Sequence, residues 1–405
     1  MVGEKGRSRG YFAFAARGMQ PNQVRHSNQR AILSVLAVYP GLSNADIARR
    51  TGLAPQTVSS VLDGLEEAGL LLRGPVRRGG GRGQPATPLY SNPDGALSLG
   101  AEIGWTHIDV AMTNLIGQVI AHNRIDYAYP DRQVVFGMLT QMLEALTSSL
   151  SADAQARILG LGLAVPGGIG RDSRLLPAPP GQAEAWADVD VGREAANATG
   201  YDVQVFNDGN AACFAEFTAM PPPRPGDFAY LLIDTFVGAG IVAEDRLWEG
   251  VTGASANIGS MLVSDRSGAS RFVHELASLL ALETRLEAAG TTLKDGMSDE
   301  PSELAQTVIA DWIEDASSAL AHAILNTATV IEFDFAVIDS ALPASTLRQL
   351  IEATSRRMLD YPSLGRPYPA IRAGHIGRPA AAQGAAQLRM YRRFYSRELA
   401  HMDDS

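Results

Sequence analysis

Residues 43–83 read SNADIARRTGLAPQTVSSVLDGLEEAGLLLRGPVRRGGGRG, and this stretch decides the fold of the N-terminal part of the chain. Ser43 is a good N-cap for a short helix, and Gly52 supplies a turn before Pro55 begins a second helix. Segment 70–73 is then predicted to be a strand that leads into a hairpin rich in arginine and glycine. This order of elements predicts a winged helix-turn-helix.

The two helices of this motif have an apolar face and leave small polar side chains outside. The apolar positions at helical spacing are Ile47, Ala48, Leu53, Val58, Val61, Leu62 and Leu65. The positions expected to contact a DNA major groove are Ser43, Asn44, Pro55, Gln56, Thr57, Ser59 and Ser60. In the wing, Arg77, Arg78 and Arg82 are expected to lie along phosphates or to enter a minor groove. Either feature alone is also typical of a packing unit or a solvated loop, but both in this order favour DNA.

The N-terminal part of the chain is basic, whereas the remainder is acidic. Residues 1–90 contain 12 Lys and Arg but only 5 Asp and Glu, whereas the remainder contains 22 basic and 39 acidic residues. Phosphate contacts dominate the affinity of proteins for DNA, so a basic N-terminal part on an acidic body fits a DNA-binding module attached to a different domain.

Length and composition limit the class of protein. A chain of 405 residues predicts two or three domains, and 46% hydrophobic residues suffice for large cores. Cys213 is the one cysteine, which excludes a disulfide framework and fits a reducing cytoplasm. We find neither a secretory signal nor an apolar run near the length of a membrane span, so we expect a cytoplasmic protein without a membrane partner.

The rest of the chain is predicted to be an α/β body. Helix 28–39 would complete a three-helix core with the two helices above. Beyond a proline-containing linker at 84–96, the patterns read strand, strand, strand, helix, strand, helix, followed by a second half of similar order. This order predicts two lobes with a cleft between them. The glycine loops at 104, 167–168 and 238–240 are expected to face that cleft.

Several motifs together resemble those of the ROK family of repressors, open reading frames and kinases, and more narrowly its sugar-responsive repressors of the xylose-repressor and NagC/Mlc type. They are SNQRAIL (27–33), the helix-turn-helix, GGGRGQPA (79–86), LAVPGGI (163–169), FNDGNAACFAE (206–216), VGAGIV (237–242), GASANIGSMLV (253–263) and IGRPAAAQGAA (376–386). The resemblance covers about residues 28–395 and implies a two-lobed sugar-kinase-like body with the actin-type ATPase fold, and self-association through that body.

With this resemblance, the chain is expected to divide into five segments. They are a flexible arm (1–26), the winged helix-turn-helix domain (27–92), ROK lobe 1 (93–215), ROK lobe 2 (216–385) and a C-terminal helix and tail that returns to lobe 1 (386–405).

The sequence departs from the family where its kinases bind ATP. Kinases of the family have an Asp-Ile-Gly-Gly-Thr loop, whereas this chain has Glu102 at the acidic position and Trp105 at the second glycine. In the second phosphate loop Phe236 replaces a glycine, and Asp339-Ser340 replaces a Gly-Gly near the adenosine. Bulky rings prevent the backbone from approaching phosphate, so we expect the chain not to use ATP.

The family zinc site is also expected to be missing. The resemblance places a histidine after Gly-Glu-Ile-Gly and then a cysteine cluster, but residues 256–260 read ANIGS and no cysteine follows. Tetrahedral zinc needs about four nitrogen or sulfur ligands. We therefore expect no metal and no cofactor.

The resemblance also implies a carbohydrate site. Asn207 and Asp208 stand at the sugar site of the family kinases, in which the aspartate that matches Asp208 is the catalytic base. The plainer interpretation of these two residues is a strand-to-helix turn with a cap. Asn257 takes the place of a sugar-binding glutamate, and His274, or Glu275 after a one-residue shift, takes that of another. Gly167 and Gly168 resemble the glycines of the sugar loop.

These observations predict a sequence-specific transcriptional regulator, with repression the expected mode. We expect it to bind a palindromic operator in double-stranded DNA as a homodimer or homotetramer, under control of a carbohydrate in the cleft and without kinase activity. The alternatives are a ROK carbohydrate kinase with an appended DNA module, a body that serves only for dimerisation, and an emptied effector site regulated by a protein partner.

Overall fold

The computed structural model describes residues 20–76, 87–169, 176, 178–221, 224, 226–362 and 365–396. The chain forms two compact units, one of residues 1–95 together with 391–405, the other of residues 96–390. The division of the structure separates only these two units, so the lobe limits expected from the sequence stay predictions. Among the described residues, no helix is both long and apolar enough to cross a membrane.

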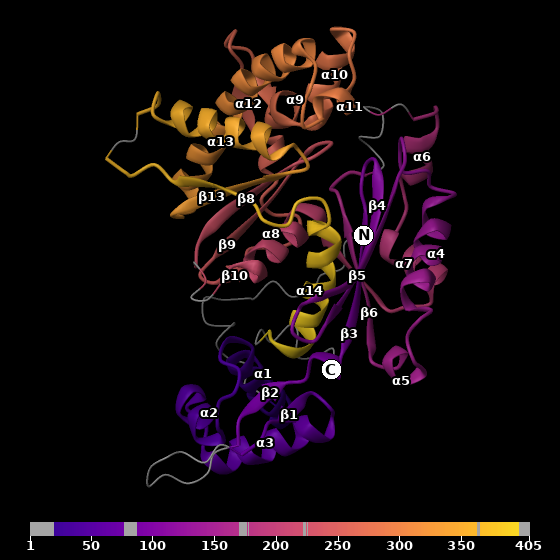
Figure 1. Cartoon of the computed structure of the whole chain (residues 1–405), viewed down its shortest axis with the longest axis vertical. Coiled ribbons are helices and arrows are strands. Elements are labelled where there is room, and N and C mark those ends of the chain that lie inside the picture. The colour runs from indigo at the N-terminus through magenta and orange to yellow at the C-terminus, as the bar shows by residue number, and fades with distance from the viewer. Residues whose placement is uncertain are drawn as a thin grey trace, which may run out of the picture. The chain divides into compact units, whose positions relative to one another are not determined.

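Within residues 20–76 and 87–95, the described part of the N-terminal unit, the chain forms three α-helices and a two-stranded hairpin (Figure 1). Its elements are α1 (Pro21–Val38), α2 (Asn44–Thr51), α3 (Pro55–Glu67), β1 (Leu71–Arg73) and β2 (Leu89–Ser91). The strands β1 and β2 are antiparallel, and the three helices enclose a core in which Ile32, Ile47 and Val58 are fully buried. The expected helix-turn-helix and hairpin are therefore present.

Helix α1 begins earlier than the sequence predicts. It starts at Pro21, so residues 21–26, which we assigned to a flexible arm, are helical. Proline fits the first helical position, and the backbone N–H of Gln20 donates to the side chain of Gln23. The wing arginines Arg77, Arg78 and Arg82 lie outside the described residues.

The larger unit contains two five-stranded sheets that share one topology. The first sheet has the order β5-β4-β3-β6-β7, and the second has the order β10-β9-β8-β13-β14. In each, an antiparallel meander is followed by strands that pair in parallel, which confirms the repeated order predicted from the sequence. The first sheet consists of β3 (Leu97–Ile103), β4 (His107–Asn114), β5 (Val119–Asp126), β6 (Ile158–Val165) and β7 (Val203–Asn207). The second consists of β8 (Phe228–Ile233), β9 (Val237–Ala243), β10 (Arg246–Leu247), β13 (Phe335–Ser340) and β14 (Ala370–Ala373).

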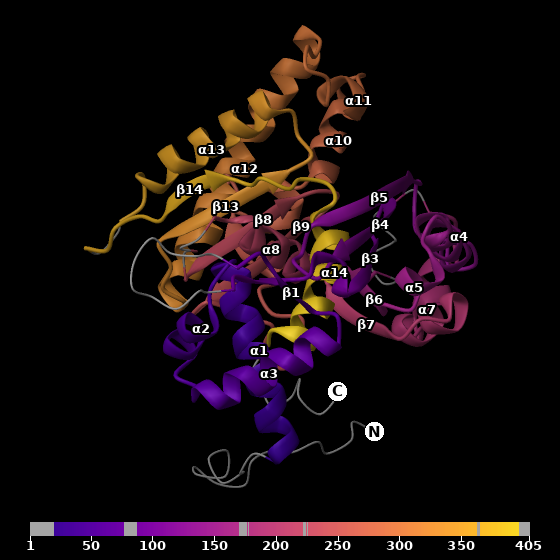
Figure 2. The ribbon, with the colours of Figure 1, turned by 60° about the horizontal axis from the view of Figure 1, so that its bottom comes forward.

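Helices cover both sheets (Figures 1 and 2). Near the first sheet these are α4 (Val135–Thr147), α5 (Ala152–Gln155), α6 (Gln182–Trp186) and α7 (Val191–Thr199). The others are α8 (Asp208–Ala219), α9 (Val273–Ala277), α10 (Leu279–Ala288), α11 (Leu293–Gly296), α12 (Glu303–Val330), α13 (Ala344–Met358) and α14 (Ala380–Phe394). A short hairpin, β11 (Leu262–Ser264) with β12 (Ser270–Phe272), precedes α9.

Glycines allow α14 to pack directly against backbone. A Cβ atom at Gly100 or Gly162 would lie about 2 Å from a carbonyl oxygen of α14, and one at Gly384 would lie 1.7 Å from the carbonyl oxygen of Ala211 in α8. In Figure 1, α14 accordingly runs between the two sheets. This close packing fixes α8, whose first residue is Asp208, against α14.

Candidate functional site

The first helix of the helix-turn-helix is held by a reciprocal cap. The N–H of Asp46 donates to Ser43 Oγ over 3.2 Å, and Ser43 Oγ donates to the Asp46 carboxylate over 2.6 Å. Gly52 ends the helix with φ 71°, a conformation that glycine adopts readily. Ser43 is therefore the N-cap of α2, and its side chain is hydrogen bonded to Asp46 within the protein.

The start of α3 presents polar groups to solvent. Asn44 Nδ2 donates to Ser59 Oγ over 2.9 Å, which ties the first turn of α2 to α3. Gln56 and Ser60 are exposed, whereas Val58 between them is fully buried. The N-cap of α3 is Ala54, whose side chain accepts no hydrogen bond, so backbone N–H groups of the first turn are open to an anion.

Two further arginines of this unit are engaged with neighbouring side chains. Arg73, on β1, contacts Glu66 over 2.7 Å and Asp63 over 3.1 Å, so its charge is balanced by α3. The guanidinium of Arg50 lies 3.8 Å from the centre of the Tyr39 ring. Neither residue is among the positions predicted to contact DNA.

The larger unit contains a cavity of about 970 Å³ where loops from both sheets converge. The strands β3, β6, β7 and β8 all end at this cavity, as expected for a ligand site in an α/β fold. All seven residues predicted to bind an effector line it, namely Gly167, Gly168, Asn207, Asp208, Asn257, His274 and Glu275. The structure thus brings them together, while their binding of a carbohydrate stays a prediction.

Asn207 and Asp208 form the junction between β7 and α8. Asn207 Oδ1 accepts the N–H of Asn210 over 3.1 Å, so this residue caps the helix. Its Nδ2 atom donates to Asp208 Oδ1 over 2.9 Å, and the N–H of Gly209 donates to the same oxygen. Burial, reinforced by the charges of Glu102 and Asp234, raises the pKa of Asp208 to about 7. Asp208 can therefore exchange a proton near neutral pH.

Two loops around the cavity contain left-handed residues. Gly168 has φ 85°, which explains a glycine at this position. Ala256 has φ 62° although it carries a Cβ atom, and it directly precedes the exposed Asn257. The loop that presents Asn257 is therefore strained.

His274 is built into the cavity wall more firmly than Glu275. Its Nδ1 atom accepts the N–H of Val237 over 3.1 Å, and its Nε2 atom lies 3.2 Å from Ser260 Oγ. Burial lowers the pKa of His274 to about 4, so the imidazole is neutral at neutral pH. Glu275 is exposed and accepts the N–H of Phe272, which makes it a helix cap.

A buried charge cluster lies beside the cavity. The Nε2 atom of His107 is 3.2 Å from Glu102 Oε2 and 3.5 Å from Asp109 Oδ2. Burial disfavours a charge on His107, but Glu102 and Asp234 outweigh this effect and raise the pKa of His107 to about 9. Arg124 and His122 contact the Asp109 carboxylate at 2.6 and 2.7 Å. A protonated imidazole and an arginine in this cluster fit an ion-pair network better than a metal site.

The two loops that resemble phosphate loops contact each other across the cavity. The Trp105 and Phe236 ring centroids are 4.9 Å apart in an edge-to-face arrangement. The Oγ1 atoms of Thr106 and Thr235 lie 3.1 Å apart. Phe236 also contacts His274, with ring centroids 5.5 Å apart. Side chains thus fill the space between the two loops.

Comparison with known proteins identifies the family. The ROK family model matches residues 98–391, and a winged helix-turn-helix DNA-binding model matches residues 25–71. The chain belongs to the ROK family. Its fold is the two-lobed ROK fold, preceded by a winged helix-turn-helix domain.

Individual ROK relatives agree with this assignment. The xylose repressor of Bacillus subtilis is 25% identical over 243 residues, which cover 59% of this chain and 61% of the repressor. Among solved structures, a ROK family transcriptional regulator described as a homolog of the Escherichia coli Mlc protein aligns with a TM-score of 0.69, at 20% identity over 95% of this chain and all of that one. A ROK family glucokinase from Streptomyces griseus, in complex with glucose and AMPPNP, aligns with a TM-score of 0.55, at 18% identity over 72% of this chain and 99% of the kinase.

Several groups of the ROK cavity were not identified from the sequence. Asp234 helps to raise the pKa of Asp208, His107 pairs with Glu102, and Ser260 contacts His274. The sequence signal that could have identified His107 is its position directly after the altered phosphate loop. Asp234 and Ser260 gave none, because isolated polar residues at strand ends are common.

Proposed function

We propose that this ROK protein is a DNA-binding transcriptional repressor that acts in the cytoplasm and senses a carbohydrate without phosphorylating it. The observation that carries the proposal is the pairing of Trp105 with Phe236, because the rings fill the space between two loops that resemble phosphate loops. The helix-turn-helix supplies the DNA-binding half of the function.

For DNA recognition, we propose that α3 enters the major groove. Its exposed Gln56, Ser60 and half-buried Thr57 would reach base edges, while N–H groups of its first turn would approach a phosphate. Asn44 and Ser59 hydrogen bond to each other, so together they would fix the angle between α2 and α3. Arg77, Arg78 and Arg82 would add contacts from the wing. Two such modules in a homodimer or homotetramer would read a palindromic operator.

For sensing, we propose that the cavity binds a neutral sugar or polyol. Asp208 and the Asn257 amide offer the acceptors and donors that hold vicinal hydroxyls, and neutral His274 closes the wall. To regulate, the sugar must bind the DNA-competent and DNA-incompetent states with different affinities. The family xylose repressor of Bacillus subtilis makes pentoses the first ligands to test.

Glu102 supports the absence of kinase activity. It stands at the acidic position of the altered phosphate loop, where its carboxylate pairs with buried His107 over 3.2 Å. An acid engaged in this way is not available to orient a metal-bound phosphate.

Asp208 favours the alternative of a ROK carbohydrate kinase, because a carboxyl with a pKa of about 7 suits a general base. A coupled ATPase assay across pentoses and hexoses separates the two functions. We expect no sugar-dependent turnover. Turnover that disappears in an Asp208→Asn variant would establish the kinase instead.

Operator binding is tested by gel-shift titration with DNA from the region around the gene, with and without each sugar. We expect a retarded protein–DNA complex, and we expect one of the sugars to change the amount of this complex. A thermal-shift screen with the same sugars separates a sensing body from one that serves only for dimerisation, because selective binding raises the melting temperature.

A further inference from the structure

One wall of the cavity is made by a segment whose central hairpin has little apolar anchoring. The hairpin segment, defined here as residues 257–274, contains the hairpin of β11 and β12 and places Asn257 and His274 at the cavity. In the hairpin itself Leu262 and Phe272 are 60% and 45% exposed, and Val263 is the buried residue. Apolar burial therefore fixes the hairpin weakly, whereas Ile258 and Val273, which flank it, are buried in the core next to Asn257 and His274.

The ROK family resemblance implies zinc near this segment, but the residues present do not fit zinc. His274 accepts the N–H of Val237 at one ring nitrogen and contacts Ser260 Oγ at the other. Asp265 accepts hydrogen bonds from Ser267 and Ala269 within the hairpin turn. The one cysteine of the chain, Cys213, lies in α8. This set supplies no group of four free ligands.

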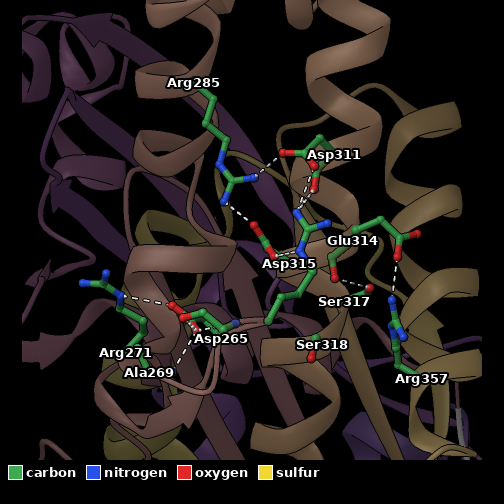
Figure 3. A network of polar contacts seen from close by, with 12 residues as sticks. Asp265, Ala269, Arg271, Arg285, Asp311, Glu314, Asp315, Ser317, Ser318 and Arg357 are labelled. Atoms are coloured by element: carbon green, nitrogen blue, oxygen red, sulfur yellow. Dashed lines mark hydrogen bonds and ion pairs between the residues drawn. The ribbon is translucent and has the colours of Figure 1, made fainter.

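Charged side chains tie the hairpin segment to α12, and the same α12 carboxylates bind a second arginine from α10 (Figure 3). Arg266, in the hairpin turn, reaches Asp315 over 2.5 Å and Asp311 over 2.9 Å, both on α12. Arg285, on α10, reaches the same two carboxylates over 2.7 and 3.2 Å. The four residues Arg266, Arg285, Asp311 and Asp315 are called the clasp below.

The clasp differs from an ordinary surface ion pair. Asp315 is only 13% exposed and is shared by both guanidinium groups. Burial opposes its ionisation, but the hydrogen bonds from Arg266 and Arg285 prevail and hold the pKa of Asp315 below its usual value. Isolated exposed pairs contribute little, whereas several charges that share a sheltered carboxylate form a network that contributes more.

We propose that the clasp positions the hairpin segment, and with it Asn257 and His274, for the ligand, in place of a metal. Arg285 lines the cavity and belongs to the clasp, so one set of contacts fixes both the hairpin and the neighbouring wall. The part of this proposal that concerns the ligand rests on the proposed function, and the part that concerns the hairpin does not.

The test compares hydrogen exchange of amides 261–274 in the full-length protein and its variants. Arg266→Ala removes the hairpin's contribution to the clasp without touching a residue that lines the cavity. Arg357→Ala is the matched control, because Arg357 pairs with Glu314 of the same helix over 2.5 Å at a comparable exposure. Arg266→Lys keeps the positive charge but removes the guanidinium group that contacts Asp311 and Asp315 together.

We expect exchange in this segment to rise about tenfold in Arg266→Ala, less in Arg266→Lys, and not in Arg357→Ala. About 1 M NaCl should speed exchange of these amides in the wild type, because the Debye length falls to about 3 Å and the ion pairs of the clasp are screened. Salt should not speed exchange further in Arg266→Ala, because that variant has already lost the contacts of Arg266. EDTA should change nothing in the wild type. Unchanged exchange in Arg266→Ala, or faster exchange of wild-type protein in EDTA, would overturn the proposal. If Arg266→Ala does not fold, the Lys variant and the salt series decide.

Calorimetric titration with D-xylose and D-glucose tests the ligand part. If either sugar binds the wild type, we expect Arg266→Ala to weaken its binding at least about fivefold and Arg357→Ala to leave it unchanged. Equal affinity in Arg266→Ala would overturn the link between the clasp and the ligand. If no sugar of a wider panel binds the wild type, the proposed effector fails, while the exchange result still decides the role of the clasp.

Discussion

The ring of Trp105 meets the ring of Phe236 edge-on, at 72° and with 4.9 Å between centroids. Each residue stands where the ROK resemblance places a glycine, in two loops that lie far apart in sequence. These two side chains thus form one contact. A contact of this kind stabilises the protein between two loops that resemble phosphate loops.

Replacing Trp105 should therefore cost stability. Trp105 is 7% exposed, and Trp105→Ala is expected to lower the free energy of unfolding by about 3–5 kcal/mol, the usual cost of removing a buried aromatic side chain. Trp248 is 46% exposed, so Trp248→Ala should cost less than about 1 kcal/mol. Urea unfolding measures both. Similar values for the two variants would show that the Trp105 contact does not form.

The raised pKa of Asp208 predicts a cost to stability that depends on pH. The native carboxyl keeps its proton up to about pH 7, whereas the unfolded chain loses it near 3.8. The native state binds more protons between these values, so the contribution of Asp208 to stability falls as pH rises through this window. Asp208→Asn should therefore melt above the wild type at about pH 8 and lose most of that advantage at about pH 5.

Differential scanning fluorimetry at both pH values measures this difference. Asp299→Asn, at an exposed position, serves as the control and should show the same small change at each pH. A melting difference for Asp208→Asn that does not depend on pH would contradict the raised pKa.

The strained loop at Ala256 predicts a stabilising substitution. A left-handed conformation costs a residue with a Cβ atom about 1–2 kcal/mol, so Ala256→Gly should raise the free energy of unfolding by about 1 kcal/mol. Ala254 has no such conformation, and Ala254→Gly should lower it by about 0.5–1 kcal/mol through the unfolded state. Urea unfolding of both variants checks the opposite signs. The same sign for both would disprove the strain.

The interface with DNA predicts two kinds of defect. Gln56→Ala or Thr57→Ala should relax base preference and lose about 1–3 kcal/mol of discrimination at one position of the site. Arg77→Ala and Arg82→Ala should weaken binding to most sequences and reduce the slope of log affinity against log salt by about 0.9 per lost phosphate contact. Gel-shift titrations at several salt concentrations distinguish the two. No change in either pair of variants would disprove the docking of α3 and the wing.

Strong local signals explain why the helix-turn-helix was predictable. Ser43, Gly52 and Pro55 occupy a cap, a turn and a first helical position, and each acts within a few residues. The early start of α1 at Pro21 was missed, because neither Gln20 nor the polar first turn signals a helix strongly. Periodicity also predicted the repeated order of strands and helices along the chain, since buried strands form continuous apolar runs.

The candidate site was predictable in part. The motifs assigned seven residues to one ligand site, and loops at the strand ends bring all seven to one cavity. The contacts that connect them depend on distant pairs, such as Arg266 with Asp315 and Glu102 with the buried charge of His107. Periodicity and capping patterns do not encode such pairs. The hairpin of β11 and β12 escaped prediction for a related reason, since it has few apolar residues and is held by charge.

The central claim is that a DNA-binding module has been joined to a ROK body that senses a carbohydrate. One measurement tests it most directly: a fluorescence anisotropy titration of the protein onto a labelled fragment from its own locus, repeated with each of a panel of sugars. We predict binding at least about 10³-fold tighter than to unrelated DNA, and a change of about fivefold or more with one sugar. Equal affinity for both DNA fragments, unaltered by every sugar, would contradict the account.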